Sequence, residues 1–132
     1  MIVFSHIAIF CSDLDKMEKF YQDVFSMKTL WKNKDDKAYL TTGNQDNFGL
    51  LRKEGYVNKN PYDLKRIMDD PNLTPNFPHF GVVVDSEKEF EQLMIKIKEM
   101  GIDIVGPKVS KDKTKSFYFL DPEYNPVHVV IQ

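Results

Sequence analysis

The sequence of 132 residues contains only one cysteine and three histidines, the residues through which small folds are cross-linked. A single cysteine cannot form a disulfide within the chain, so a disulfide-stabilised fold is excluded. The lone Cys11, together with the lack of a signal-peptide pattern, favours a reducing, cytoplasmic setting. No apolar run approaches the roughly 20 residues of a membrane-spanning helix. We therefore expect no membrane partner.

The chain also lacks an excess of charge of either sign. It has 18 Lys and Arg against 20 Asp and Glu, a formal net charge of -2, so no overall positive field attracts nucleic acid. The densest basic stretch, 108–115, is interrupted by Asp112 and has no aromatic residues for base stacking. We expect no nucleic-acid partner. The chain is long enough for one domain with its own core.

The two halves of the chain resemble each other in chemistry. When His6 is aligned with His79, SHIAIFCSDLDKMEKFYQDVFSM lies over PHFGVVVDSEKEFEQLMIKIKEM, with apolar residues matched to apolar residues. The ends of the halves align too, NFGLL over NPVHV, which places Leu50 opposite His128. Such an internal repeat predicts that both halves fold alike.

Each half is predicted to form a strand, a helix and three further strands. Ser12 is the predicted N-cap of the first helix, Ser86 with Glu89 forms a predicted capping box for the second, and Gly101 ends that helix. The first module spans 1–54 and the second 79–132. The predicted strands are 2–10, 29–32, 38–42 and 48–52 in the first module, and 80–84, 102–105, 116–120 and 127–131 in the second.

The linker between the modules, 55–78, is rich in Pro, Asn and Asp. Asn60 followed by Pro61 indicates a helix start, and Pro71 indicates its end, so a short helix is predicted there. A connection this long either serves as a lid or wall of a site or spaces the two modules.

All three histidines fall at or within predicted strands that the repeat relates to one another. His6 and His79 start or lie on the first strand of each half, and His128 lies in the last strand of the second. Three imidazoles can bind a transition metal and leave positions open for substrate, as in catalytic metal sites. A histidine on an apolar strand can equally be a core or edge residue that a hydrogen bond satisfies. The shared placement of all three favours the metal site.

These features resemble the vicinal oxygen chelate superfamily, which includes glyoxalase I, bleomycin-resistance proteins, fosfomycin-resistance enzymes and extradiol dioxygenases. The resemblance covers nearly the whole chain and is carried by SHIAIFCSDLDKMEKFYQDVF, AYLTTG, HFGVVVDSEKEFEQL and, most specifically, SFYFLDPEYNPVHVVIQ. It implies a single α+β domain over 1–132, in which two βαβββ modules form a curled, open mixed sheet around a metal site. It also implies a homodimer with its pocket at or near the interface.

The resemblance implies a ligand set of His6, His79 and His128 for a divalent metal ion, either Fe(II), Zn, Ni, Co or Mn. His128 stands where most family members have a glutamate ligand. Leu50 matches a fourth position that glyoxalase I fills with glutamate and that fosfomycin enzymes and dioxygenases leave without a ligand. Neither Leu50 nor His128 offers a carboxylate base, so ordinary glyoxalase I activity is not expected.

Tyr118 is the candidate catalytic residue, because family members often direct a tyrosine from this strand into the pocket. A hydrogen bond from its phenol would orient the substrate, and the alternative is a half-buried aromatic of the sheet. Arg52 either reaches a pocket mouth or lies on the surface. No fourth histidine is available as the acid-base that extradiol dioxygenases use. Against a fosfomycin enzyme, Ala8 replaces a substrate-binding threonine, and the sequence stops at Gln132, before the segment with the phosphonate-binding arginine.

We therefore predict a metal-dependent enzyme of the glyoxalase/dioxygenase superfamily that acts on a small oxygen-chelating substrate, by dioxygenase or by lyase or isomerase chemistry. Two other functions stay open. One is a metal-free drug- or metabolite-binding protein of the bleomycin-resistance type, which needs only an aromatic, amphipathic cleft. The other is a thiol transferase of the fosfomycin type.

Overall fold

A computed structural model describes the chain except for residues 3, 60, 62, 65–77, 110–111 and 132. The chain divides into two compact units, Met1–Lys59 and Asn60–Gln132, and each is described by itself. The helix predicted after Asn60 lies almost wholly outside the described residues. No helix in the described part of the chain is long and apolar enough to cross a membrane.

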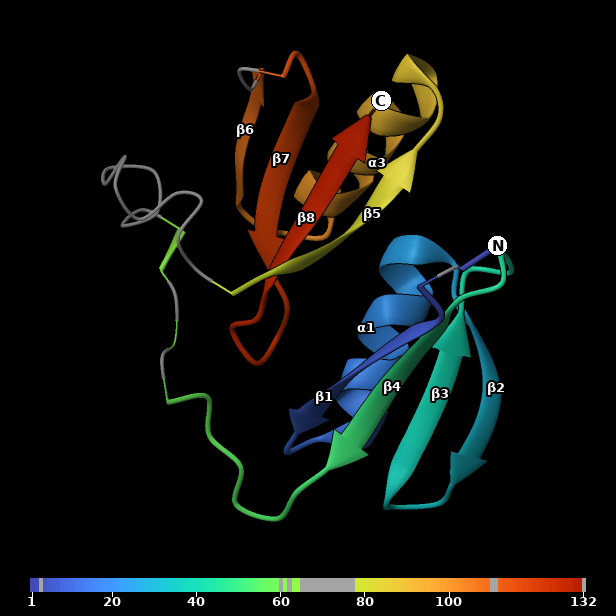
Figure 1. Cartoon of the computed structure of the whole chain (residues 1–132). Helices are drawn as coiled ribbons and strands as arrows, with labels where there is room; N and C mark the ends of the chain where they lie inside the picture. The colour runs from blue at the N-terminus through green and yellow to red at the C-terminus, as the bar shows by residue number, and fades with distance from the viewer. Residues whose placement is uncertain (3, 60, 62, 65–77, 110–111, 132) are drawn as a thin grey trace. The chain divides into compact units, whose positions relative to one another are not determined.

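The first unit is a four-stranded mixed sheet with one helix against it (Figure 1). Its strand order is β1-β4-β3-β2, with β1 and β4 parallel and the other pairs antiparallel. The helix α1 packs against β4 and β3. Its elements are β1 (His6–Cys11), α1 (Leu14–Phe25), β2 (Lys28–Asn33), β3 (Lys37–Thr41) and β4 (Asn47–Arg52).

The second unit repeats this arrangement. Its strand order is β5-β8-β7-β6. The pair of β5 and β8 is parallel, and the pairs β8–β7 and β7–β6 are antiparallel. Its elements are β5 (Phe80–Val84), α3 (Glu87–Glu99), β6 (Ile104–Val109), β7 (Lys115–Leu120) and β8 (Pro126–Ile131). The predicted α+β fold of two βαβββ modules is therefore confirmed.

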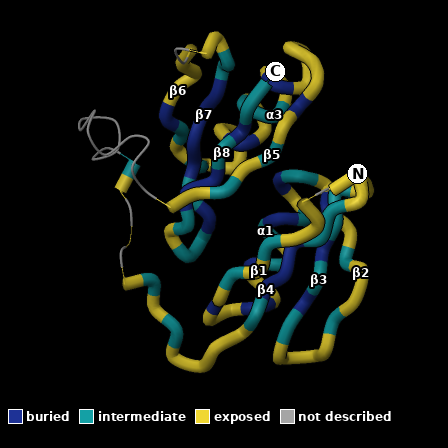
Figure 2. Tube along the Cα trace, viewed as in Figure 1, coloured by how far each residue is buried: buried dark blue, intermediate teal, exposed yellow. Residues whose placement is uncertain are grey.

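Each helix forms because one face buries apolar side chains over its sheet, which is the main source of helical stability in folded proteins. In α1, Met17 and Tyr21 are fully buried, and the Tyr21 ring lies 4.6 Å from the ring of Phe48 in β4. In α3, Phe90 is fully buried, with its ring 5.2 Å from that of Phe117 in β7. Figure 2 shows buried segments along the middle strands of both sheets. In the described part of each unit, the core therefore lies between the sheet and its one helix.

The helix caps agree with the predictions in the second unit and differ by one residue in the first. Ser86 caps α3, and its hydroxyl accepts from the backbone N–H of Glu89 at 3.1 Å. Asp13, not Ser12, caps α1, because its carboxylate accepts from the backbone N–H of Lys16 at 3.1 Å. Both residues are good N-caps, so the sequence alone does not separate them.

The predicted first strand, 2–10, was wrong at both ends. It is observed as His6–Cys11, and it pairs residue by residue with Asn47–Arg52 of β4. Since β4 begins at Asn47, the partner of His6, the ladder between the two strands begins at His6. His6 is therefore the first residue of its strand.

Candidate functional site

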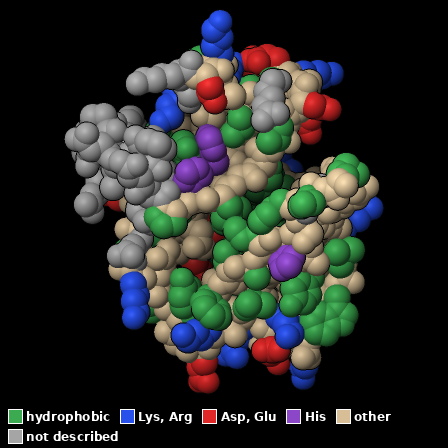
Figure 3. Space-filling view, viewed as in Figure 1, with side chains coloured by type: hydrophobic (Ala, Val, Ile, Leu, Met, Phe, Trp, Pro, Cys, Tyr) green, Lys and Arg blue, Asp and Glu red, His purple; other side chains and the backbone are tan. Residues whose placement is uncertain are grey.

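The second unit brings two of the three candidate ligands together. His79 directly precedes β5, and His128 lies in β8, the strand that pairs with β5. Their ring centroids are 5.4 Å apart, with an angle of 81° between the ring planes. Figure 3 shows histidine side chains reaching the surface of the molecule. The parallel pairing of β5 and β8 is what places these two imidazoles side by side.

Tyr118 completes this group, which we call the histidine cluster: His79, His128 and Tyr118. Tyr118 is the cross-strand partner of His128 in the β7–β8 pair. Its ring lies parallel to the imidazole, with centroids 4.1 Å apart and an angle of 4° between the planes. The ring of His79 stands edge-on to that of Tyr118 at 5.4 Å and 79°. The flat stack fixes the plane of the His128 ring.

The cluster keeps His128 neutral. Burial, followed by electrostatic interactions with His79 and Lys108, lowers the pKa of His128 from 6.5 to about 4. Burial also raises the pKa of Tyr118, so its phenol stays protonated at neutral pH. The ammonium of Lys108 lies 5.5 Å from the centroid of the Tyr118 ring, which places a cation beside the cluster.

The donor chemistry of the cluster fits a metal ion. The Nε2 atom of His128 is buried and has no hydrogen-bond partner among the described residues, which is costly for a polar atom. A neutral imidazole with a free ring nitrogen is a common ligand of Zn(II) and related metals. The cluster supplies one such nitrogen, Nε2 of His128, and places the imidazole of His79 beside it. Within the described part of the chain, no group of three His, Cys, Asp or Glu side chains could hold a metal ion.

His6, the third candidate ligand, lies in the first unit at the start of β1. Its Nδ1 atom is 2.9 Å from the hydroxyl oxygen of Ser5, and its side chain is exposed. Its cross-strand neighbour Asn47 has a buried Oδ1 atom without a hydrogen-bond partner in the described residues. His6 thus has one ring nitrogen in a local contact. A role as the third ligand remains a prediction.

The prediction that Leu50 is the counterpart of His128 in the first unit is wrong. In the second unit Gly81 pairs with His128, which in turn pairs with Tyr118. In the first unit, Ala8 pairs with Gly49 and Gly49 with Tyr39, so Gly49 is the equivalent of His128. Leu50 is fully buried. A shift of one residue turns a side chain to the other face of a sheet, and Leu50 therefore joins the core.

The space above Gly49 is taken by its neighbours. A Cβ atom there would lie 3.0 Å from the Cβ of Ala8 and 3.1 Å from the Tyr39 ring. The Tyr39 ring is also 5.8 Å from that of Trp31 in β2. The first unit therefore has an aromatic ring where the second has an imidazole. The sequence could have shown this equivalence, because Tyr39 lies as far before Gly49 as Tyr118 lies before His128.

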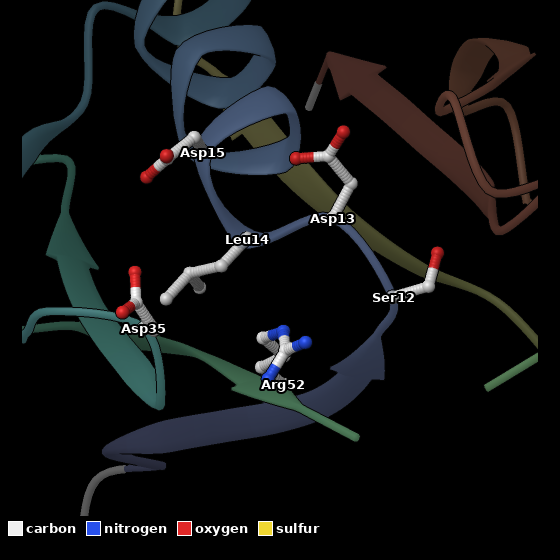
Figure 4. A pocket seen from close by; sticks show the side chains of 6 residues that line it. All are labelled: Ser12, Asp13, Leu14, Asp15, Asp35 and Arg52. Carbon is white, nitrogen blue, oxygen red and sulfur yellow. The ribbon is translucent and has the colours of Figure 1, made fainter. Parts of the chain in front are cut away.

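A polar cavity of about 360 Å³ lies elsewhere, at the start of α1 (Figure 4). Arg52 lines this cavity and is itself exposed, so neither of the two predictions for this residue is singled out. Asp13 in its wall is already the helix cap. The cavity contains none of the three histidines. Its lining residues are Ser12, Asp13, Leu14, Asp15, Asp35 and Arg52.

The family is settled by a match to the family model described as Glyoxalase/Bleomycin resistance protein/Dioxygenase superfamily, which covers residues 3–129. The chain belongs to this glyoxalase superfamily. It is 30% identical over 119 residues to the glutathione transferase FosA of Serratia marcescens, an alignment that covers 90% of this chain and 73% of the relative.

Solved structures of the glyoxalase superfamily share the fold at low identity. Lactoylglutathione lyase from Agrobacterium tumefaciens has a TM-score of 0.72 at 18% identity, with 98% of this chain and 92% of that chain covered. A mutant of FosX, a fosfomycin resistance protein from Listeria monocytogenes, in complex with Mn(II) and 1S,2S-dihydroxypropylphosphonic acid, has a TM-score of 0.73 at 17% identity. That match covers 98% of this chain and 90% of the FosX chain.

Gly81 is predicted to be essential for the close approach of β5 and β8. A Cβ atom at this position would lie 2.8 Å from the Cβ of His128 and closer still to its carbonyl oxygen. We expect Gly81→Ala to lower the free energy of unfolding by about 1–3 kcal/mol or more, because main chain must move. Gly49→Ala is the matched control and should cost less, since a Cβ there would lie no closer than 3.0 Å to any neighbour. Chemical unfolding that shows an equal or larger loss for Gly49→Ala would contradict this account.

The lowered pKa of His128 predicts a specific dependence of stability on pH. The unfolded chain takes up the proton near pH 6.5 and the folded chain only near pH 4, so this contribution is complete above pH 6.5 and is lost as the pH falls toward 4. When the pH falls from 7.5 to 4.5, the free energy of unfolding of the metal-free protein should drop by on the order of 1–2 kcal/mol more than that of His128→Asn. Urea unfolding in the presence of EDTA measures this difference. Equal losses in the two proteins would show that His128 has an ordinary pKa.

Proposed function

We propose that this protein is a metal-dependent enzyme that acts on a small molecule able to chelate a metal ion through adjacent oxygens. The observation that carries the proposal is the buried Nε2 atom of His128, which has no partner in the described residues and lies on a neutral imidazole next to His79. An unsatisfied buried ring nitrogen is costly unless a ligand completes it. Membership of the glyoxalase superfamily supports the same conclusion.

His79 and His128 would hold the metal ion from the second unit, and His6 would be the third ligand from the first. When bound, such an ion acts as a Lewis acid that polarises the substrate oxygens or activates oxygen. Candidates are Fe(II), Zn, Ni, Co and Mn. The reaction is then of the dioxygenase type or of the lyase or isomerase type.

The protein's own residues would orient the substrate. The phenol of Tyr118 stays protonated, so it can donate a hydrogen bond to a substrate oxygen but cannot act as a base at neutral pH. His128 accepts a proton only near pH 4, so as a free imidazole it is a poor base at neutral pH as well. The cluster is therefore suited to holding and polarising a substrate more than to moving its protons.

Metal binding tests the proposal directly. Protein purified without an affinity tag should carry, or take up, one equivalent of a divalent metal, and His128→Ala should weaken binding at least about tenfold because a direct ligand is lost. Ile95→Ala, an exposed position on α3, is the control and should bind metal as the unaltered chain does. Calorimetric titration measures the affinities. A chain that binds no metal, and whose ligand binding survives His128→Ala, is instead the metal-free binding protein.

A second candidate is a thiol transferase, and the similarity over most of this chain to the glutathione transferase FosA of Serratia marcescens favours it. The metal-loaded protein would then join glutathione to fosfomycin, and Tyr118→Phe would slow the reaction if the phenol orients the substrate. Mass spectrometry of the product measures the adduct. The absence of any adduct with glutathione or other small thiols would leave the lyase, isomerase or dioxygenase chemistries.

The proposal includes a cytoplasmic homodimer. Its pocket would lie at or near the interface, as the family resemblance implies. Light scattering should give twice the single-chain mass of 15.5 kDa. If the measured mass is that of one chain at all concentrations, the proposal of a dimer is wrong, while the proposal of a metal site is unaffected.

A further inference from the structure

The polar cavity at the start of α1 is a feature of the first unit alone, because every residue that lines it belongs to that unit. Its walls are the first turn of α1, the turn between β2 and β3, and the end of β4 (Figure 4). The backbone N–H of Arg52 donates to the carbonyl of Asp36 at 2.7 Å. The N–H of Lys53 donates to the carbonyl of Cys11 at 2.9 Å. Main-chain hydrogen bonds therefore hold these walls together.

Two carboxylates of the cavity wall are already engaged in the fold. Asp13 caps α1 by accepting from the backbone N–H of Lys16 at 3.1 Å. Asp15 pairs with the ammonium of Lys32 at 2.6 Å. Hydrogen bonds to Asp15 and Glu18 raise the pKa of Lys32 well above its ordinary value, so this ammonium stays charged. A ligand that used either carboxylate would have to compete with these contacts.

The two other charged groups of the wall, Arg52 and Asp35, have opposite signs. Arg52 comes from β4, and Asp35 comes from the turn before β3. Among the residues that the structure describes, neither side chain forms an ion pair or a hydrogen bond. A guanidinium carries a fork of N–H donors that matches a carboxylate, and a carboxylate accepts hydrogen bonds from an ammonium. The cavity thus offers one positive and one negative group that are both available to a ligand.

From this arrangement we propose that the cavity binds a small zwitterion, a molecule with one carboxylate and one ammonium group such as a free amino acid. The carboxylate of the ligand pairs with Arg52, its ammonium pairs with Asp35, and its apolar part contacts the buried side chain of Leu14. A ligand with a single charge satisfies only one of the two groups. The volume of about 360 Å³ is at the lower end of the range for small-molecule pockets, which suits a ligand of this size.

This site is independent of the proposed metal-dependent activity, since its wall contains none of the three histidines. A metal ion is not its ligand, because no group of three His, Cys, Asp or Glu side chains in the described ranges could hold one. The two charged groups are exposed, so water screens their attraction for a ligand. We therefore expect a dissociation constant of about 1 mM for an amino acid.

Three matched compounds test the need for both charges. L-leucine has both, isopentylamine is leucine without its carboxylate, and isocaproate is leucine without its ammonium. Each is titrated into the full-length chain in the presence of EDTA, so that chelation of a metal ion by the amino acid does not contribute. We expect L-leucine to bind about fivefold or more tightly than either analogue. No saturable binding of L-leucine, or equal affinity for all three compounds, overturns the inference.

NMR of the same titration locates the ligand. Binding of L-leucine should shift the backbone amide signals of 12–15, Asp35 and Arg52. Shifts at His79 and His128 without shifts at the cavity residues would place the amino acid at the histidine cluster. That result overturns the zwitterion site and leaves the metal-dependent enzyme in place.

Substitutions in the wall separate the two charges. Arg52→Gln should weaken L-leucine by about fivefold or more and leave isopentylamine unchanged, whereas Asp35→Asn should weaken L-leucine by a similar factor and leave isocaproate unchanged. Lys88→Gln and Asp103→Asn are the matched controls, since they remove the same charges from exposed positions of the second unit. Neither wall substitution removes an ion pair in the described residues, so both variants should fold. An unchanged L-leucine affinity in either wall variant overturns the inference.

Discussion

The candidate site depends on one close approach, that of the main chains of β5 and β8 at Gly81 and His128. Parallel strands pair at a fixed spacing, and here the pair has room for only one side chain. That side chain is the imidazole of His128. The same pairing brings His79 alongside it, and the next strand, β7, places Tyr118 against its flat face. Burial within this group keeps the imidazole neutral and leaves Nε2 without a partner in the described residues.

In the first unit, the side chain at this close approach belongs to the first strand and not to the last. At the equivalent pair, Ala8 has the side chain and Gly49 has none. The vacant direction is covered by Tyr39, the counterpart of Tyr118. The two units thus share one fold but differ at this position. The second unit presents the imidazole of its last strand, and the first presents an aromatic ring. A Cβ atom at Gly49 would contact Ala8 and Tyr39, so β4 presents no side chain at the position equivalent to His128.

Much of the fold could be predicted because the repeat, the apolar spacing and the capping box at Ser86 and Glu89 all point to the same elements. The closeness of His79 and His128 was predictable for a similar reason, since both lie at predicted strands of the second module, whereas the role of His6 stays a prediction. The register of the last strand of the first unit was predicted wrongly. The loops that precede it and its counterpart are equally long, 42–46 and 121–125, but Gly49 has no side chain to mark the position that matches His128. The alignment therefore placed Leu50 one residue away, on the buried face.

The contact between the rings of Trp31 and Tyr39 in the first unit has an optical consequence. Trp31 is the only tryptophan of the chain, so all tryptophan fluorescence originates in one unit. The histidine cluster lies in the other unit, apart from this fluorophore along the chain. A change in emission when a metal ion binds would thus show that binding affects the first unit, as a ligand from His6 requires. The single tryptophan is therefore an intrinsic probe of the first unit.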